Sequence, residues 1–191
     1  MAMTKKECRS WFRQEWAGMA EADLAEISER VCRQILTSPQ WDSANGILAY
    51  LSFGKEISLD NLIIESLKAG KTIALPLIES KTEMTFRMIS SWKPEEFIIN
   101  PWGIREPSTD APEYKLKSGD LILVPGLGFS GEGKRIGRGG GYYDRFLAKN
   151  ISMGTFLMGI TCNSCLSDHI PVVDHDIPVQ SVCTETGIIS P

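Results

Sequence analysis

The chain has 191 residues, of which 42% are hydrophobic and 23% are charged, and its formal net charge is −4. This length predicts one domain over residues 1–191 with a substantial core. The negative balance argues against a general affinity for nucleic acids or anionic membranes. The N-terminus lacks the apolar core of a signal peptide, and no apolar run is long enough to cross a bilayer. We therefore expect a soluble, cytoplasmic monomer with no nucleic-acid or membrane partner.

Apolar residues at helical spacing predict that the chain opens with two amphipathic helices. The residues that carry them are Cys8, Trp11, Phe12 and Trp16, followed by Leu24, Ile27, Val31 and Ile35. Ser38-Pro39 has the residue types of a helix cap and first position, and it predicts a short third helix. Ser58 is the expected cap of a fourth helix, which continues through Lys68 and ends at Gly70.

Short apolar runs between and after these helices predict strands. The expected strands are Gly46–Phe53, Lys71–Leu77, Met84–Met88, Asp120–Val124, Gly154–Thr161 and Val182–Ile188. The segment Pro94–Asp120 has prolines at positions 94, 101, 107 and 112, so we expect it to be an irregular surface connection.

Alternation of strands and helices predicts an α/β fold with three layers (α/β/α) and a mainly parallel, Rossmann-like sheet. Ligands of such sheets bind at the carboxyl ends of the strands. Three segments would lie at such ends: Leu51–Glu56, Gly126–Gly141 and the loop after Thr161. We expect these segments to share one cleft.

The segment Gly126–Gly141 contains eight glycines and follows an apolar strand. Glycines let the backbone approach a ligand and turn its amide groups toward phosphate oxygens. A helix starting near Tyr142 would add its positive end, and Lys134, Arg135 and Arg138 would add full charges. The segment therefore predicts a binding site for an oligophosphate.

Two short motifs in this segment do not fit their usual structures. Gly126, Gly128 and Gly131 satisfy the dinucleotide pattern G-x-G-x-x-G, but a further run of glycines follows where that motif requires a helix. The seven residues from Gly128 to Lys134 resemble a P-loop, but the next residue is Arg135 in place of the hydroxyl that binds magnesium. We reject both interpretations.

The five cysteines are an odd number, which fits reduced thiols better than a disulfide framework. Cys162-x-x-Cys165, followed by His169 and His175, offers the kinds of ligand that zinc prefers. Only one C-x-x-C pair is present, however, and Cys162 follows the apolar run Phe156–Thr161, where a buried cysteine is ordinary. Buried thiols are the favoured interpretation, and a structural zinc is the alternative.

Pro125–Phe129, Gly133 and Arg135–Asp144 together match the pattern P-G-x-[AG]-F-D-x-x-G-x-R-[LI]-G-x-G-x-G-Y-Y-D, except that Ser130 replaces its aspartate. This run resembles the signature of the 5-formyltetrahydrofolate cyclo-ligase family, also called methenyltetrahydrofolate synthetases. Further pieces resemble the family in the same order along the chain: Lys5 and Arg9, Tyr50–Ser52, Glu56-Ile57, Gly70–Pro76, Gly103–Pro107, and Pro171 with His175-Asp176. The resemblance also implies a fold related to sugar-phosphate isomerases and CoA transferases.

The resemblance implies a ligase that cyclises 5-formyltetrahydrofolate, with or without a polyglutamate tail, to 5,10-methenyltetrahydrofolate with ATP and Mg²⁺. In the family reaction the formyl oxygen is thought to attack the γ-phosphate, after which N10 closes the ring and phosphate leaves. Such chemistry requires alignment, exclusion of water and charge stabilisation, and it needs no protein nucleophile.

The residue roles below are those that the resemblance implies. The catalytic residues are Arg135 and Arg138. The ATP-binding residues are Lys5, Arg9, Arg135, Ile136, Gly137, Arg138, Gly139, Gly140, Gly141, Tyr142 and Tyr143. The folate-binding residues are Leu51, Glu56, Arg138, Gly139, Gly140, Gly141 and Tyr142. The Mg²⁺ ligands are Asp144 and Asp176, with His175 expected to orient the latter. Lys134 is a weaker candidate, and Arg13 is expected at the surface.

Two other classes stay open. A catalytically silent relative would bind folate or nucleotide without turnover, but it should have lost the metal carboxylates or the loop arginines. A sugar-phosphate isomerase or CoA transferase would need a carboxylate base in the glycine loop, where Glu132 is the only candidate. Single residues also have structural alternatives, because Asp144 could cap a helix, Asp176 could lie in a turn before Pro178, and Tyr143 could pack under the loop.

Overall fold

The computed structural model describes residues 3–100, 103–151, 154–171, 173 and 176–191. The helices are α1 (Lys5–Gly18), α2 (Glu21–Leu36), α3 (Pro39–Ser43), α4 (Asp60–Lys68) and α5 (Tyr142–Asn150), with 3₁₀ turns η1 (Pro94–Glu96) and η2 (Asn163–Cys165). The strands are β1 (Gly46–Leu48), β2 (Thr72–Ile78), β3 (Met84–Ile89), β4 (Phe97–Ile99), β5 (Arg105–Pro107), β6 (Leu121–Pro125), β7 (Gly128–Phe129), β8 (Arg135–Ile136), β9 (Phe156–Ile160), β10 (Ser181–Thr184) and β11 (Gly187–Ile189). None of the described helices is both long and apolar enough to cross a membrane.

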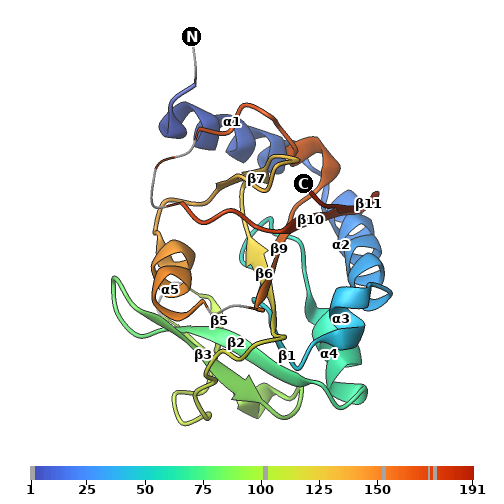
Figure 1. Ribbon diagram of the computed structural model, residues 1–191, viewed down its shortest axis with the longest axis vertical. Coiled ribbons are helices and arrows are strands. Elements are labelled where there is room, and N and C mark those ends of the chain that lie inside the picture. Colours follow the sequence, from blue (N-terminus) through green and yellow to red (C-terminus); the bar gives the residue numbers. More distant parts are fainter. Residues whose placement is uncertain (1–2, 101–102, 152–153, 172, 174–175) are drawn as a thin grey trace.

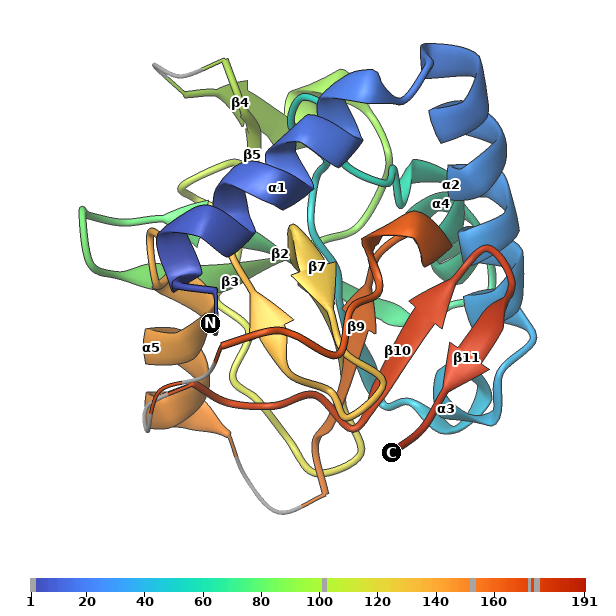
Figure 2. The same ribbon diagram turned by 90° about the horizontal axis from the view of Figure 1, so that it is seen from above.

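A central sheet of seven strands runs in the order β11-β10-β9-β6-β1-β2-β3. The five strands from β10 to β2 are mutually parallel, and only the two edge strands pair antiparallel. Figures 1 and 2 show α2, α3 and α4 on one side of this sheet and α5 on the other. The predicted three-layer α/β fold with a mainly parallel sheet is confirmed.

Alternating residues of the central strand β6 explain why helices cover both faces of the sheet. Leu121 and Leu123 face a cluster that includes side chains of α2 and α4, whereas Ile122 and Val124 face a second cluster that includes side chains of α5. All four are at most 1% exposed. Each face therefore gains the stabilisation of a buried apolar layer, as a parallel sheet requires.

The helix α1 packs over the glycine-rich loop and helps to position it. Thr4 and Glu7 form a capping box at its first turn. The ring of Phe12 is fully buried, and the indole N–H of Trp16 donates to the Leu127 carbonyl at 2.8 Å. Figure 1 shows α1 beside β7, at the start of this loop. The amphipathic helix predicted from its apolar spacing therefore holds the loop in place.

Three predicted elements differ from the structure. Val182–Ile188 was expected to be one strand, but it divides into β10 and β11, which pair antiparallel around a turn at residues 185–186. The segment Pro94–Asp120 is not simply irregular, because it contains η1 and the β4–β5 hairpin. The expected strand Gly46–Phe53 is regular only over β1, although its continuation through Leu51 is buried.

The glycine loop is also more regular than predicted, because β7 and β8 pair as a short hairpin across it. Ser130 closes the hairpin, because its amide donates to the Lys134 carbonyl at 2.9 Å, its carbonyl accepts from the Gly133 amide at 3.0 Å and its hydroxyl accepts from the Lys134 amide at 3.1 Å. The fourth helix starts at Asp60, whose amide donates to the Ser58 hydroxyl at 3.2 Å, although Leu59 is the cap residue.

Candidate functional site

A cavity of about 390 Å³ opens at the carboxyl ends of β1, β2 and β6. Leu51 follows β1, Ile78 ends β2 and Gly126 follows β6, and all three line the cavity. Asp176 lines it as well, from the segment after β9. The three segments that were expected to share one cleft therefore all contribute residues to this cavity.

Most of the predicted site residues line this cavity. They are Arg9, Leu51, Glu56, Arg135, Gly137, Arg138, Gly139, Gly140, Gly141, Tyr142, Tyr143, Asp144 and Asp176. Lys5 is not a lining residue, but it is bonded to one, because its ammonium contacts both oxygens of Asp176. Ile136 is the exception, since its side chain is buried in the core. His175 lies outside the described residues.

The carbonyl groups of the glycine loop are held by arginines that approach from outside the loop. Arg9 donates to the Gly137 carbonyl at 3.0 Å, and Arg13 donates to the Arg138 carbonyl at 3.2 Å. Arg145 donates to the Gly140 carbonyl at 2.8 Å. Arg13 was expected only as a surface residue; it is exposed, but it also carries one of these contacts. The three bonds fix the path of the loop around the cavity.

The first turn of α5 faces the cavity, because its cap residue Gly141 and the first three helical residues are all lining residues. Gly141 has a left-handed backbone (φ 66°) and offers no side chain to the free amides of the turn. The positive end of a helix and its uncapped amides favour an anion at this position. The helix predicted to start near Tyr142 thus has its positive end at the cavity, where it would stabilise a bound phosphate.

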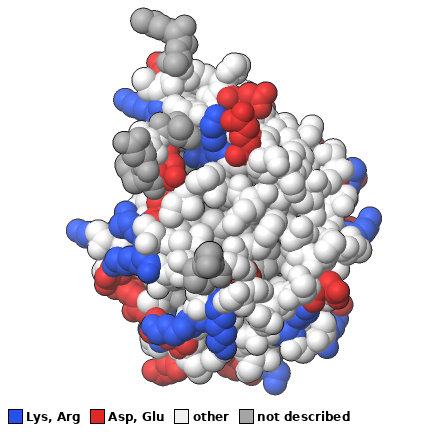
Figure 3. Space-filling view, viewed as in Figure 1, with Lys and Arg blue, Asp and Glu red and all other residues white. Residues whose placement is uncertain are grey.

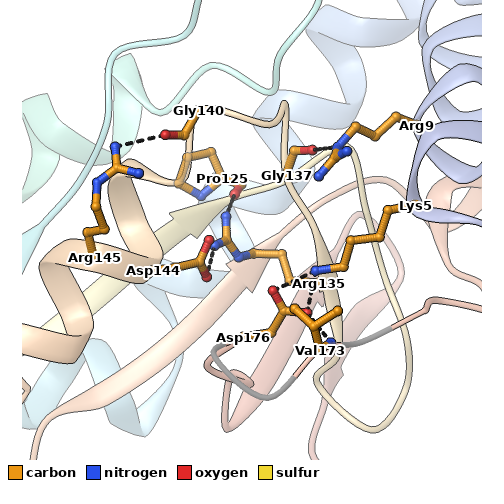
Figure 4. A network of polar contacts seen from close by, with 10 residues as sticks. All are labelled: Lys5, Arg9, Pro125, Arg135, Gly137, Gly140, Asp144, Arg145, Val173 and Asp176. Atoms are coloured by element: carbon orange, nitrogen blue, oxygen red, sulfur yellow. Dashed lines mark hydrogen bonds and ion pairs between the residues drawn. The ribbon is translucent and has the colours of Figure 1, made fainter. Parts of the chain in front are cut away.

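Two carboxylates in the cavity are paired with two of its cations (Figure 4). Arg135 Nη2 lies 2.5 Å from Asp144 Oδ1, and Lys5 Nζ lies 2.5 Å from Asp176 Oδ2. The Arg135 side chain is 8% exposed, so an unpaired charge there would be costly. Asp176 also accepts from the Val173 amide at 2.8 Å. These pairs place two carboxylates and two cations in one polar region at the cavity.

Arg138 and Glu56, which come from opposite walls, are bonded to each other. Arg138 Nε donates to Glu56 Oε1 at 2.7 Å, and its Nη2 donates to the Phe53 carbonyl at 3.2 Å. Glu56 Oε2 accepts from the Phe53 amide at 2.9 Å. Both oxygens of Glu56 therefore accept hydrogen bonds.

On the face of the molecule that Figure 3 shows, acidic and basic side chains lie next to one another.

Aromatic and aliphatic side chains form the other part of the cavity wall. Tyr50 and Tyr143 line it together with Leu51, Met84 and Ile104. Burial raises the pKa of both tyrosine hydroxyls well above the usual value, so both are neutral at physiological pH. The cavity thus combines a charged region at the glycine loop with a less polar region between β2 and the β4–β5 hairpin.

Sequence reasoning missed three charged lining residues: Arg145, Arg105 and Glu106. Arg145 comes directly after the motif, and it joins the loop to the β2–β3 turn through the Thr82 carbonyl at 2.8 Å. Arg105 and Glu106 belong to the piece Gly103–Pro107, which was matched to a family but given no role. Nothing in the sequence alone showed that β5 would pack against β2 beside the cavity.

The charged residues at the tip of the glycine loop do not line the cavity. Lys134 Nζ pairs with Glu132 Oε2 at 2.5 Å, and this pair holds the pKa of Glu132 below its usual value. Ser130 is 1% exposed and lies in the hairpin turn. Neither the weaker candidate Lys134 nor Ser130, where the sequence departs from the motif, lines the cavity.

The cysteine pair Cys162 and Cys165 is buried, and all five cysteines of the chain are free thiols. The Cys162 thiol lies 3.3 Å from the Ser164 hydroxyl, and hydrogen bonds from Cys165 and Ser164 lower its pKa below the usual value for a thiol. Within the part of the chain that is described, no three His, Cys, Asp or Glu side chains form a metal cluster. The described residues therefore favour buried thiols, and His175, the fourth ligand of the zinc alternative, lies outside them.

A parallel sheet whose strands end at a cavity with a glycine loop, cations and carboxylates defines a small-molecule-binding α/β protein. Comparison with known proteins gives the family. Residues 2–185 match the 5-formyltetrahydrofolate cyclo-ligase family, so the chain belongs to this family of ligases. The predicted family membership is confirmed.

Named relatives and solved structures agree with this assignment. The chain is 27% identical to the 5-formyltetrahydrofolate cyclo-ligase of Mus musculus, covering 95% of this chain and 93% of that protein. It is also 27% identical to that of Escherichia coli (strain K12), covering 92% and 97%. The methenyltetrahydrofolate synthetase structure from Aquifex aeolicus superposes with a TM-score of 0.85 at 28% identity, covering 98% of this chain and 93% of the other. A Mycoplasma pneumoniae synthetase, at 18% identity and a TM-score of 0.76, supports the fold.

Proposed function

We propose that this protein converts 5-formyltetrahydrofolate to 5,10-methenyltetrahydrofolate at the expense of ATP, releasing ADP and phosphate. The observation that carries the proposal is the cavity itself. The glycine loop, the first turn of α5 and two arginines form its charged region, and tyrosines and aliphatic side chains form the remainder. Such a cavity suits one ligand with a triphosphate and another with a flat heterocycle.

In the proposed reaction the formyl oxygen attacks the γ-phosphorus, and the bond from that phosphorus to the ADP oxygen breaks. The product is an N5-iminium phosphate. N10 then adds to the former formyl carbon and loses its proton, and the carbon–oxygen bond breaks to release phosphate as the ring closes. The protein would contribute alignment and charge stabilisation, and none of these steps needs a covalent bond to a side chain.

Arg135 and Arg138 would stabilise the charge that spreads over the phosphoryl group during transfer. Both line the cavity, and both now donate to carboxylates, which a phosphate would replace as the partner. Lys5 and Arg9 would hold the nucleotide from α1, and the amides of Gly137–Gly141 would contact its phosphates. Arginines outside the glycine loop already donate to three of its carbonyl groups. This geometry supports the proposed contacts between the amides of the loop and the phosphates.

Asp144 and Asp176 would hold Mg²⁺. The ion binds to few carboxylates and completes its shell with water and phosphate oxygens, so two carboxylates beside a phosphate site suit it. Each is paired here with a cation, Arg135 or Lys5, that a nucleotide phosphate would attract. Bound Mg²⁺ would neutralise part of the phosphate charge.

The folate would occupy the less polar region, in contact with Leu51, Glu56 and Tyr142, with its formyl group toward Gly139–Gly141. Tyr142 lines the cavity, and its hydroxyl is anchored to the β2–β3 turn because it donates to the Ser80 carbonyl at 3.3 Å. We further propose that the protein acts in the cytoplasm as a monomer and accepts folates with a polyglutamate tail. Five buried free thiols fit a reducing compartment.

The rival functions are a silent relative and a sugar-phosphate isomerase or CoA transferase. The described carboxylate Glu132, which the second rival would need as a base, is paired with Lys134 outside the cavity. Thermal unfolding with ATP–Mg²⁺, a sugar phosphate or coenzyme A separates the classes, because a ligand that binds only the native state raises Tm. We expect a shift with ATP–Mg²⁺ alone, and release of one ADP per methenyl product. A shift without product would support the silent relative, and a shift with a sugar phosphate or coenzyme A would contradict the proposal.

A further inference from the structure

Glu106 is a buried residue of the cavity wall whose carboxylate has no cationic partner among the described residues. It lies on β5, next to Arg105, and the residue is 6% exposed. Among the described residues, the only hydrogen bond to its carboxylate comes from the Ile78 amide to Oε1, and this bond is long at 3.3 Å. The neighbouring guanidinium of Arg105 turns instead to Asp60, with contacts of 3.1 and 2.9 Å.

A carboxylate in a cavity wall is best satisfied when donors reach both of its oxygens. Within the described part of the chain, Glu106 makes no ion pair, and Oε2 accepts no hydrogen bond. Because Glu106 lines the cavity, a ligand can supply the missing donors. A heterocycle with an amino group next to a ring N–H presents two donors side by side, which is the pattern that a carboxylate accepts.

Glu56, the other glutamate of the cavity, is a poorer acceptor for a ligand in this structure. Its Oε1 accepts from Arg138 at 2.7 Å and its Oε2 accepts from the Phe53 amide at 2.9 Å. A ligand that bound Glu56 would have to share each oxygen with one of these donors. Glu106 offers Oε2 to a ligand without such sharing, because the single long bond to its carboxylate from the described residues involves only Oε1.

A second polar group in the same wall is also unsatisfied. The Tyr143 hydroxyl is buried and has no hydrogen-bond partner among the described residues, although its residue lines the cavity. Buried hydroxyls in native proteins are nearly always bonded. Glu106 and Tyr143 both line the cavity, and each carries a polar group that the described residues leave under-satisfied.

We propose that Glu106 is the specificity-determining residue of the substrate site, and that its carboxylate accepts the 2-amino group and the adjacent ring N–H of the reduced pterin. This assignment rests on the proposed function, since it takes 5-formyltetrahydrofolate as the ligand. Glu56 then serves mainly to hold Arg138 and the Phe53 backbone. The pterin edge lies against β5, the strand that covers the less polar region of the cavity.

The test is to measure calorimetric Kd values for 5-formyltetrahydrofolate without ATP in wild type, Glu106→Gln and Glu95→Gln. Glu106→Gln keeps an acceptor for the Ile78 amide and removes the charge, and Glu95 is an exposed control in the same segment. We expect Glu106→Gln to weaken folate binding by about 10- to 100-fold while ATP affinity changes by less than about twofold. Glu95→Gln should match wild type. Folate binding by Glu106→Gln at wild-type strength would overturn the assignment.

A substrate analogue with methyl in place of the 2-amino group makes the test independent of the variant's folding. Wild type should lose a similar factor on the analogue, and Glu106→Gln should lose little more, because the same contact is already gone. Equal binding of analogue and substrate by wild type, or losses that multiply in the variant, would overturn the assignment. Failure of wild type to bind or convert 5-formyltetrahydrofolate at all would overturn the proposed function and the assignment with it.

Discussion

The position of α1 on the glycine loop depends on the absence of a side chain at Gly128. A Cβ at this position would lie 2.2 Å from Cζ and 2.3 Å from Cε1 of Phe12. That ring is fully buried, and Trp16 ties the same part of α1 to the Leu127 carbonyl. The ring cannot turn into solvent, so Gly128→Ala must displace α1 or the β7–β8 hairpin.

Overpacking of this kind costs about 1–3 kcal/mol, which corresponds to a fall in Tm of about 2–12 °C for a chain of this size. The control is Gly131→Ala in the same hairpin, because a Cβ there would meet nothing within 4 Å. Both changes reduce the entropy of the unfolded chain equally, so that effect cancels in the comparison. The assay is thermal unfolding, followed by titration with ATP.

Displacement of α1 would also move Lys5 and Arg9, which lie on it. We therefore expect Gly128→Ala to bind ATP more weakly than Gly131→Ala, in addition to its lower Tm. Equal Tm values for the two variants would refute the packing argument. A lower Tm with unchanged ATP affinity would refute the proposed role of α1 in nucleotide binding.

Three further predictions follow from the site and the core. Asp144→Asn should raise the Mg²⁺ concentration for half-maximal activity by at least about tenfold, and an unchanged Mg²⁺ titration would exclude Asp144 as a ligand. Ser130→Asp should change the turnover rate by less than about tenfold, since Ser130 lies in the hairpin turn and not at the cavity; a larger gain would refute this. Burial raises the pKa of Cys183 from 9.0 to about 12, so its contribution to stability is complete below about pH 9 and is lost as the pH rises toward 12. Urea midpoints from about pH 7 to about pH 11 should therefore fall less steeply in Cys183→Ala than in wild type, and equal slopes would contradict this.

The sequence predicted the layers and the parallel sheet because these depend on local periodicity and on the order of elements. It failed at Val182–Ile188 because the turn between β10 and β11 is Glu185-Thr186, which lacks the usual glycine or asparagine signal. The β7–β8 hairpin was missed for another reason. Its strands have two residues each, and they are held by tertiary contacts such as Phe12 on Gly128, not by their own strand propensity.

The site was predictable where one continuous segment carries it, as in the glycine loop and the start of α5. It was not predictable where contacts join distant segments. Lys5 and Asp176 are 171 positions apart, and only the fold shows that they form an ion pair. Glu106 gave no signal, because a carboxylate in a proline-rich connection is ordinarily solvated, and its burial depends on the packing of β5 against β2.

The most direct test of the account is the rate at which the methenyl chromophore forms from 5-formyltetrahydrofolate in wild type, Arg138→Ala and Arg30→Ala, each with and without ATP and Mg²⁺. Arg30 is an exposed control on α2. We predict that product forms only when ATP and Mg²⁺ are both present, that Arg138→Ala slows it by at least about 100-fold, and that Arg30→Ala matches wild type. Product formation without ATP, or an unchanged rate in Arg138→Ala, would contradict the central claim that the glycine loop and its arginines transfer the phosphoryl group.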